Sequence, residues 1–316
     1  MTGRLDFERD GKDWPNRETS RFVTANGLRF HVQIAGAGPV MLLLHGTGAS
    51  THSWRGLLPL LAKHFTIVAP DLPGHGFTGD PGMNGLSITG MARSIRALLN
   101  EMKLEPVLGV GHSAGAAILI RMALDKQLAP DSIISLNGAL VPFGGFAGQF
   151  FAPIARMFAT LPLMTTMFAW RARDPRVIDD ILKQTGSRLD PDGIALYRRL
   201  AGNGEHISAA LGMMANWDLH TLERDMLRLQ TPLVLVAGLR DEMVRPSVSR
   251  DVKERLKTAS LVNLPGLGHL AHEENPDLVA ELIRNVVAGR EPVSPEQAKG
   301  RKTAVQQAAQ MQGIRP

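Results

Sequence analysis

A serine between two glycines stands at the centre of residues 111–115, which read Gly-His-Ser-Ala-Gly. An apolar run ends just before this segment and a stretch with helical spacing follows it, which is the setting of a nucleophile elbow. Glycines are required there because larger side chains would collide with the neighbouring strand and helix. Chance would supply the motif in about one such chain in seven, and a serine that caps a helix is the structural alternative for Ser113.

A serine hydroxyl becomes a nucleophile at neutral pH when an imidazole takes its proton and a carboxylate orients that imidazole. Asp241 follows an apolar run that ends in Gly238, and His269 directly follows Gly268 after the next apolar run. Ser113, Asp241 and His269 therefore occur in the chain order that a nucleophile elbow requires. We expect these three residues to form a catalytic triad that cleaves an ester through an acyl-enzyme.

Two neighbouring residues compete for the roles of acid and base. Glu242 is an alternative to Asp241, and His272 is an alternative to His269. Only His269 keeps the Gly-His spacing, so we favour it and assign a structural role to His272. An acid could also follow the preceding apolar run, residues 132–136. That run ends in Asn137-Gly138, which supplies no charge, so we expect no acid there.

An oxyanion hole needs two backbone N–H groups aimed at the negative oxygen that develops during acyl transfer. We expect one from Ala114, directly after the nucleophile, and the other from Thr47 in the glycine-rich loop 45–48. Gly46 lets the backbone approach a ligand and is therefore a candidate substrate-binding position. Three histidines are expected to pack behind the elbow rather than bind metal, because no metal-binding motif accompanies them: His45, His75 and His112.

Short, continuous apolar runs predict strands covered on both faces, the pattern of a parallel sheet. The first two strands flank Asn26-Gly27, a dipeptide that favours a tight hairpin and so an antiparallel start. Helical spacing between the later runs predicts an α/β fold with a mostly parallel central sheet flanked by helices. The expected strands are 22–25, 28–35, 40–44, 65–69, 106–110, 132–136, 233–236 and 260–264, and the expected helices are 54–63, 87–102, 114–125, 247–257 and 276–287.

The alternation of strand and helix breaks between residues 141 and 229, where prolines, glycines and helical spacing occur without a strand pattern. We interpret residues 141–229 as a helical cap inserted into a core formed by residues 21–140 and 230–289. Residues 1–20 form a polar lead-in. Residues 290–316 lack a periodic apolar face, so we expect a disordered tail there.

The composition excludes several classes of protein. With 316 residues, 44% of them hydrophobic and 21% charged, the chain is globular rather than disordered. A cysteine count of 0 excludes disulfides and thiolate nucleophiles and suits a reducing compartment, so we expect a cytoplasmic protein. We expect no cofactor, because the loose dinucleotide-binding pattern at residues 109–114 lies outside the first βαβ unit. The 35 basic and 30 acidic side chains are mixed, so nucleic acid is not an expected partner.

Taken together, these segments resemble the α/β-hydrolase family over residues 22–287, which implies the α/β-hydrolase fold. More narrowly, three segments are similar to the magnesium-chelatase accessory family of bacteriochlorophyll biosynthesis: Asp13–Val23, His45–Arg55 and Asp71–Thr78. This narrower resemblance implies a place in tetrapyrrole synthesis, near the insertion of Mg²⁺ into protoporphyrin IX, and contact with magnesium chelatase. It assigns no reaction to the chain.

Residues 150–170 of the expected cap carry Arg156 as their only charge and are rich in methionine and aromatic side chains. Helices that cover an active site explain this composition. A flexible lining for a flat hydrophobic ligand such as a porphyrin is an alternative, with Met157, Met164 and Trp170 as candidate substrate-binding residues. Two prolines argue against a straight membrane span, whereas peripheral membrane contact stays open.

Three functions are therefore in competition. The first is a hydrolase with a competent Ser113–Asp241–His269 triad that acts on a hydrophobic small molecule beside magnesium chelatase. The second is a porphyrin-binding or chelatase-assembly factor in which the triad is unused. The third is a general esterase or C–C bond hydrolase outside pigment synthesis.

Overall fold

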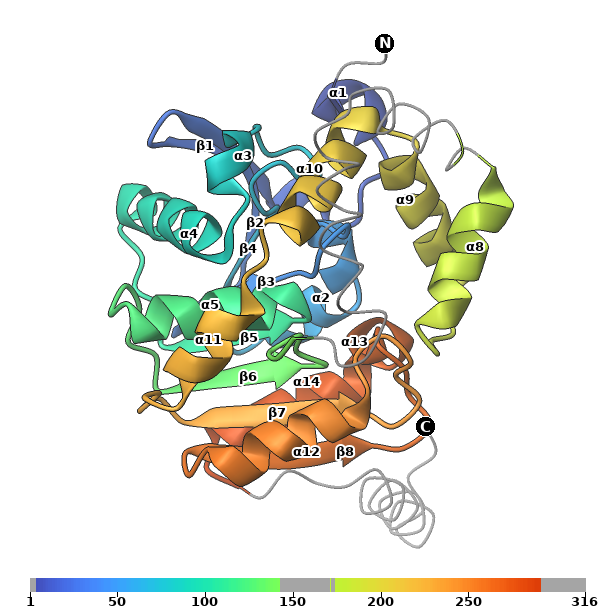
Figure 1. The fold of residues 1–316 in the computed structure, drawn as a ribbon. Coiled ribbons are helices and arrows are strands. Elements are labelled where there is room, and N and C mark those ends of the chain that lie inside the picture. Colours follow the sequence, from blue (N-terminus) through green and yellow to red (C-terminus); the bar gives the residue numbers. More distant parts are fainter. Residues whose placement is uncertain (1–3, 143–170, 172–173, 291–316) are drawn as a thin grey trace, which may run out of the picture.

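The computed structural model describes residues 4–142, 171 and 174–290. Eight strands of this part form one sheet in the order β1-β2-β4-β3-β5-β6-β7-β8, and β2 alone runs antiparallel to its neighbours (Figure 1). The strands are β1 (Ser20–Ala25), β2 (Leu28–Ala35), β3 (Val40–Leu44), β4 (Thr66–Pro70), β5 (Leu108–His112), β6 (Ser132–Leu136), β7 (Leu233–Gly238) and β8 (Ala259–Leu264).

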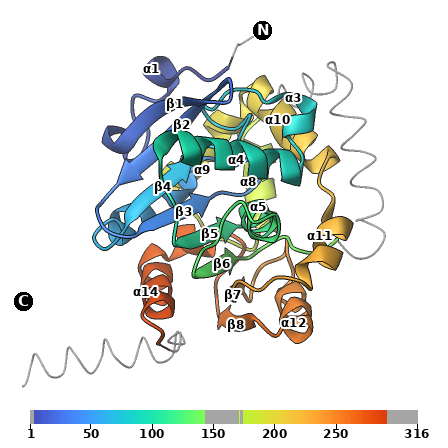
Figure 2. The same cartoon turned by 90° about the vertical axis from the view of Figure 1, so that its left-hand side faces the viewer.

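Successive side chains of the central strands pack on opposite faces of the sheet, because the side-chain period of a strand is two. In β3, Leu42 and Leu44 join one apolar cluster, whereas Met41 and Leu43 join another. Figure 2 shows helices on both sides of the sheet. One face is covered by α4 (Ile88–Met102), α5 (Ala114–Leu124) and α12 (Pro246–Arg255), and the other by α2 (Leu57–Leu61) and α14 (Pro276–Val287).

The chain between β6 and β7 contributes helices and, among its described residues, no strand. α8 and α9 lie on the side to which the arrowheads of β6 and β7 point (Figure 1). This is the edge where the loops that follow parallel strands converge. The helices are α8 (Pro175–Gln184), α9 (Pro191–Ala201), α10 (Gly204–Ala215) and α11 (Leu219–Met226).

The predicted fold is confirmed, with differences at the ends of elements that have physical causes. The helix expected from residue 54 is instead a 3-10 turn, η2 (Thr51–Trp54), followed by α2. Pro59 explains this, because it has no N–H to bond the Arg55 carbonyl and is tolerated only in the first turn of a helix. β5 begins at Leu108, two residues later than expected.

The first 20 residues carry more apolar packing than a polar lead-in suggests. They contain the short helices α1 (Phe7–Asp10) and η1 (Arg17–Thr19). Leu5 and Trp14 are buried in a cluster with Phe77. The lead-in is therefore part of the packed structure from Leu5 onward.

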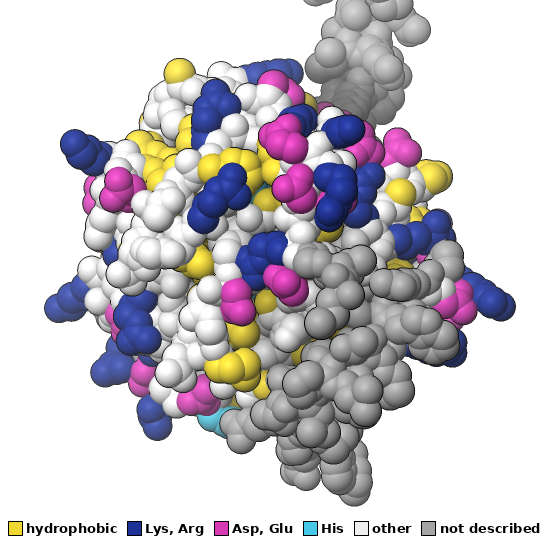
Figure 3. Space-filling view, turned by 90° about the horizontal axis from the view of Figure 1, so that it is seen from above, with side chains coloured by type: hydrophobic (Ala, Val, Ile, Leu, Met, Phe, Trp, Pro, Cys, Tyr) yellow, Lys and Arg dark blue, Asp and Glu magenta, His cyan; other side chains and the backbone are white. Residues whose placement is uncertain are grey.

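The surface of the described residues carries charges of both signs. On the face that is uppermost in Figure 1, Lys and Arg side chains lie among Asp and Glu side chains (Figure 3). No helix in the described ranges is long and apolar enough to cross a membrane.

Candidate active site

Ser113 sits on a sharp turn between β5 and α5. Its backbone has φ 50° and ψ −114°, an uncommon conformation for a residue with a side chain. A Cβ on Gly111 would lie 2.4 Å from the Ala116 nitrogen, and one on Gly115 would lie 2.0 Å from the Leu44 carbonyl oxygen. Only glycine fits at these two positions, so the local sequence dictates the turn that presents Ser113.

Asp241 and His269 follow the adjacent parallel strands β7 and β8 and meet at the same edge of the sheet. The Asp241 Oδ2 lies 2.8 Å from the His269 Nδ1. The other oxygen, Oδ1, accepts from the backbone N–H groups of Met243 and Val244, each at 2.8 Å. A carboxylate only accepts, so Nδ1 carries the proton and Nε2 keeps its lone pair. That is the tautomer a general base requires.

Asn137 belongs to the same hydrogen-bonded centre, although it carries no charge. It lies directly after β6, which pairs in parallel with β7. Its Nδ2 donates a hydrogen bond of 2.7 Å to Oδ2 of Asp241, the oxygen that also accepts from His269. The lack of charge at this position led us to expect no acid there, but its amide is a hydrogen-bond donor that we did not predict. The adjacency of the two strand ends was the signal that identifies it.

Ser113 and His269 lie in adjoining segments that contact each other through His112. The His112 Nε2 donates to the His269 carbonyl oxygen at 3.0 Å, and the two rings lie 4.7 Å apart between centroids. Within the described part of the chain the Ser113 hydroxyl makes no hydrogen bond.

The loop after β3 lies against the serine. A Cβ on Gly46 would lie 3.1 Å from the Ser113 Cβ and 2.9 Å from the His112 Nδ1, so a larger side chain would crowd the elbow. The backbone N–H groups of Thr47 and Ala114 find no acceptor among the described residues. Unpaired N–H groups beside the serine are what an oxyanion hole offers.

Helix α10 is hydrogen-bonded to this loop and to the loop after β4. Its Met213 sulfur accepts from the Thr47 hydroxyl at 3.4 Å. The His206 Nδ1 accepts from the Gly76 N–H at 3.0 Å, and its Nε2 donates to the Gly48 carbonyl at 3.1 Å. Burial lowers the pKa of His206 to about 4, so the ring is neutral and able to accept and donate at once.

The alternatives to His269 and Asp241, namely His272 and Glu242, do not take part in the Asp241–His269 hydrogen bond. His272, in α13 (Ala271–Glu274), is buried, and its Nε2 lies 2.8 Å from the Ser53 hydroxyl. Burial lowers its pKa to about 3. The centroid of its ring lies 4.5 Å from that of the His112 ring, and the two ring planes are tilted by 45°. Glu242 is exposed, whereas Asp241 is buried.

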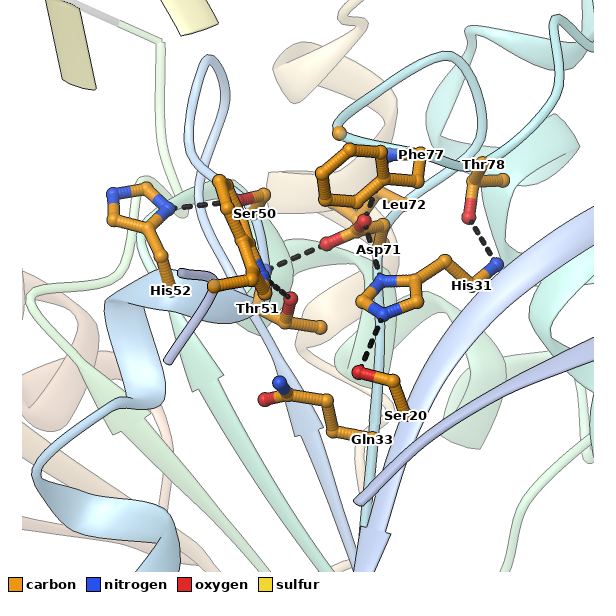
Figure 4. A network of polar contacts seen from close by, with 12 residues as sticks. Ser20, His31, Gln33, Ser50, Thr51, His52, Asp71, Leu72, Phe77 and Thr78 are labelled. Atoms are coloured by element: carbon orange, nitrogen blue, oxygen red, sulfur yellow. Dashed lines mark hydrogen bonds and ion pairs between the residues drawn. The ribbon is translucent and has the colours of Figure 1, made fainter. Parts of the chain in front are cut away.

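A second buried imidazole–carboxylate pair lies behind the loop after β3 (Figure 4). The His31 Nδ1 and the Asp71 Oδ2 are 2.8 Å apart, and both side chains are fully buried. Asp71 also accepts from the backbone N–H groups of Thr51 and Phe77, at 2.7 and 2.9 Å. Burial alone would raise the pKa of Asp71, but His31 and the Phe77 N–H hold it below its usual range. The Asp71 carboxylate thus ties β2 to the two loops beside the elbow.

Some predicted positions fall outside the described residues, namely Met157, Met164 and Trp170. Where the structure describes the chain, no group of three or more His, Cys, Asp or Glu side chains is arranged to hold a metal ion.

The family follows from comparison with known proteins. A family model described as the alpha/beta hydrolase family matches residues 41–282. Because this match covers most of the chain, the chain belongs to the alpha/beta hydrolase family.

Individual relatives add detail. Over 279 residues the chain is 35% identical to the magnesium-chelatase 30 kDa subunit of Rhodobacter capsulatus, covering 88% of this chain and 97% of that protein. It is 26% identical to the pyrrolizixenacetamide deacetylase of Xenorhabdus hominickii, covering 80% of this chain and 92% of the relative. The structure of an alpha/beta hydrolase fold protein from Burkholderia ambifaria superposes with a TM-score of 0.72 at 22% identity, covering 92% and 100% of the two chains. The resemblance inferred from the sequence is therefore confirmed.

Proposed function

We propose that this chain is a serine hydrolase that cleaves a carboxylic ester of a hydrophobic small molecule. The Asp241–His269 hydrogen bond of 2.8 Å, at the same sheet edge as the strained Ser113 turn, carries this proposal. A serine at the elbow with an oriented imidazole is the constellation for acyl transfer. Among the described residues between β6 and β7, α8, α9 and α10 act as a cap over this site.

The reaction follows from these positions. The Nε2 of His269 removes the proton from the Ser113 hydroxyl while Oγ attacks the ester carbonyl carbon. The N–H groups of Thr47 and Ala114 donate to the resulting oxyanion. The ester C–O bond then breaks, and the His269 imidazolium gives its proton to the leaving alcohol. The same imidazole then removes a proton from water, whose oxygen attacks the acyl carbon. The bond between that carbon and the Ser113 Oγ breaks, Oγ takes the proton back from the His269 imidazolium, and the carboxylic acid leaves.

Turnover of p-nitrophenyl butyrate tests this chemistry. The unmodified chain is expected to release p-nitrophenolate, and Ser113→Ala is expected to lower kcat at least about 1,000-fold while the unfolding midpoint stays unchanged. Glu242→Gln serves as a control, since its side chain is exposed. Equal turnover by the wild type and Ser113→Ala would refute the proposal.

We further propose that the reaction belongs to the cytoplasmic synthesis of magnesium tetrapyrroles, beside magnesium chelatase. The 35% identity to a protein named as a chelatase subunit supports this placement. The same name favours a second candidate, a porphyrin-binding or chelatase-assembly factor whose triad is unused. Complementation of a deletion strain separates the two. Ser113→Ala fails to restore bacteriochlorophyll if hydrolysis is the function, and restores it if assembly is.

A further inference from the structure

A short turn between α8 and α9 lies on the loop that carries His269. The turn consists of Thr185–Arg188, far from His269 in the sequence. The His269 N–H donates to the Thr185 carbonyl oxygen at 2.9 Å. The next amide, that of Leu270, donates to the Ser187 Oγ at 2.8 Å. Two consecutive backbone amides of the histidine loop are thus held by the turn rather than by their own strand or helix.

The carboxylate of Glu274 completes this connection. Its Oε1 accepts from the Gly268 N–H at 2.7 Å, and its Oε2 accepts from the Arg188 N–H at 3.0 Å. One side chain therefore bridges the residue before His269 and the last residue of the turn. Hydrogen bonds to a charged acceptor are about twice as strong as those between neutral groups.

Two glycines, Gly186 and Gly268, allow the backbone of the turn to pack closely against the loops that carry Asp241 and His269. A Cβ on Gly186, whose φ is +69°, would lie 1.7 Å from the Arg240 carbonyl oxygen, directly before Asp241. A Cβ on Gly268 would lie 2.4 Å from the Gly186 carbonyl carbon. No side chain fits between these segments, so a shift of the turn moves the loops of Asp241 and His269 with it.

We propose that the Thr185–Arg188 turn, fastened by Glu274, is a positioning element for His269. This inference rests on the proposed function, in which His269 is the general base. The turn is the C-terminal continuation of α8, so a ligand that displaces α8 changes the placement of the imidazole. The end of α8 is thereby linked to the chemical step through the turn that follows it.

Steady-state kinetics of full-length variants test this element. Ser187→Ala removes the acceptor of the Leu270 amide, and Glu274→Ala removes both bridging bonds. Each is expected to lower kcat by about 10- to 100-fold with KM nearly unchanged, because a small displacement of a catalytic group affects the transition state most. Glu274→Gln, whose oxygen replaces one of the two acceptors, is expected to fall between. Ser247→Ala and Glu254→Ala, on the exposed surface of α12, are expected to match the wild type.

Proton NMR of His269 gives a readout that does not depend on turnover. The Nδ1–H resonance, protected by Asp241, is expected to weaken through faster exchange with water in Ser187→Ala and Glu274→Ala. It is expected to persist in both controls. A raised KM at unchanged kcat, or an unchanged resonance, would overturn the positioning role. If the wild type hydrolyses no ester, the proposed function fails, and the NMR comparison still decides whether the turn holds His269.

Discussion

The side-chain amide of Asn137 donates its hydrogen bond to the same oxygen of Asp241 that His269 binds. Among the described residues the Asp241 carboxylate thus has four hydrogen-bond partners, and the amide contributes to its orientation as directly as the imidazole does. Removing a donor from a buried carboxylate leaves part of its charge without compensation.

Asn137→Ala is therefore expected to lower the free energy of unfolding by about 1.5 to 3 kcal/mol, the range for hydrogen bonds to charged groups, and to slow ester turnover. Urea unfolding and p-nitrophenyl butyrate kinetics measure the two effects. Asn263→Ala, at an exposed position of β8, is the matched control and should change neither. Wild-type stability and kcat in Asn137→Ala would contradict the assigned role.

The elbow glycines provide a second prediction. Gly115→Ala introduces a Cβ 2.0 Å from the Leu44 carbonyl oxygen, so backbone must move and about 3 kcal/mol of stability is expected to be lost. Gly202→Ala, where the nearest atom lies at 3.4 Å, is expected to change stability by less than about 1 kcal/mol. Thermal unfolding of both variants checks the difference. Equal midpoints would show that the turn tolerates a side chain.

The buried His31–Asp71 pair is expected to stabilise the loops beside the elbow. Asp71→Asn replaces one oxygen of a buried carboxylate that accepts from His31, Thr51 and Phe77, and the loss of a hydrogen bond to a charged group costs about 1.5 to 3 kcal/mol. Lys183→Ala, which breaks an exposed ion pair with Asp180, should cost less than about 1 kcal/mol. Denaturant unfolding of both variants makes the comparison. If His31→Gln and Asp71→Asn both unfold like the wild type, the pair contributes nothing to stability.

Stability is also expected to fall as the solution is acidified. Burial lowers the pKa of six histidines, to about 4 for His206 and about 3 for His272. The unfolded chain, with histidine near pKa 6.5, therefore binds more protons than the folded chain below that pH. Each histidine that stays neutral removes about 2 kcal/mol of stability between pH 7 and pH 5.

Urea unfolding at these two pH values measures the effect. His206→Gln should flatten the pH dependence, whereas His64→Gln, at an exposed position, should leave it as in the wild type. Stability that is constant from pH 7 to pH 5 would show that these rings are not held neutral.

The sheet could be predicted from the sequence because its strands are continuous apolar runs and its helices have clear spacing. The chain order of Ser113, Asp241 and His269 likewise indicated which loops meet, and their catalytic roles stay predictions. Contacts between distant segments could not be read in this way. The Asn137 donor could have been found from the pairing of β6 with β7, whereas the Thr185–Arg188 turn depends on backbone packing, which leaves no pattern along the chain.

If the proposed function is right, Ser113 is an activated nucleophile. The most direct measurement is the intact mass of the protein after incubation with diisopropyl fluorophosphate, followed by peptide mapping. We expect a single covalent adduct on Ser113 in the wild type, slow labelling in His269→Ala and no adduct in Ser113→Ala. An unlabelled wild type, or equal labelling of Ser113→Ala, would contradict it.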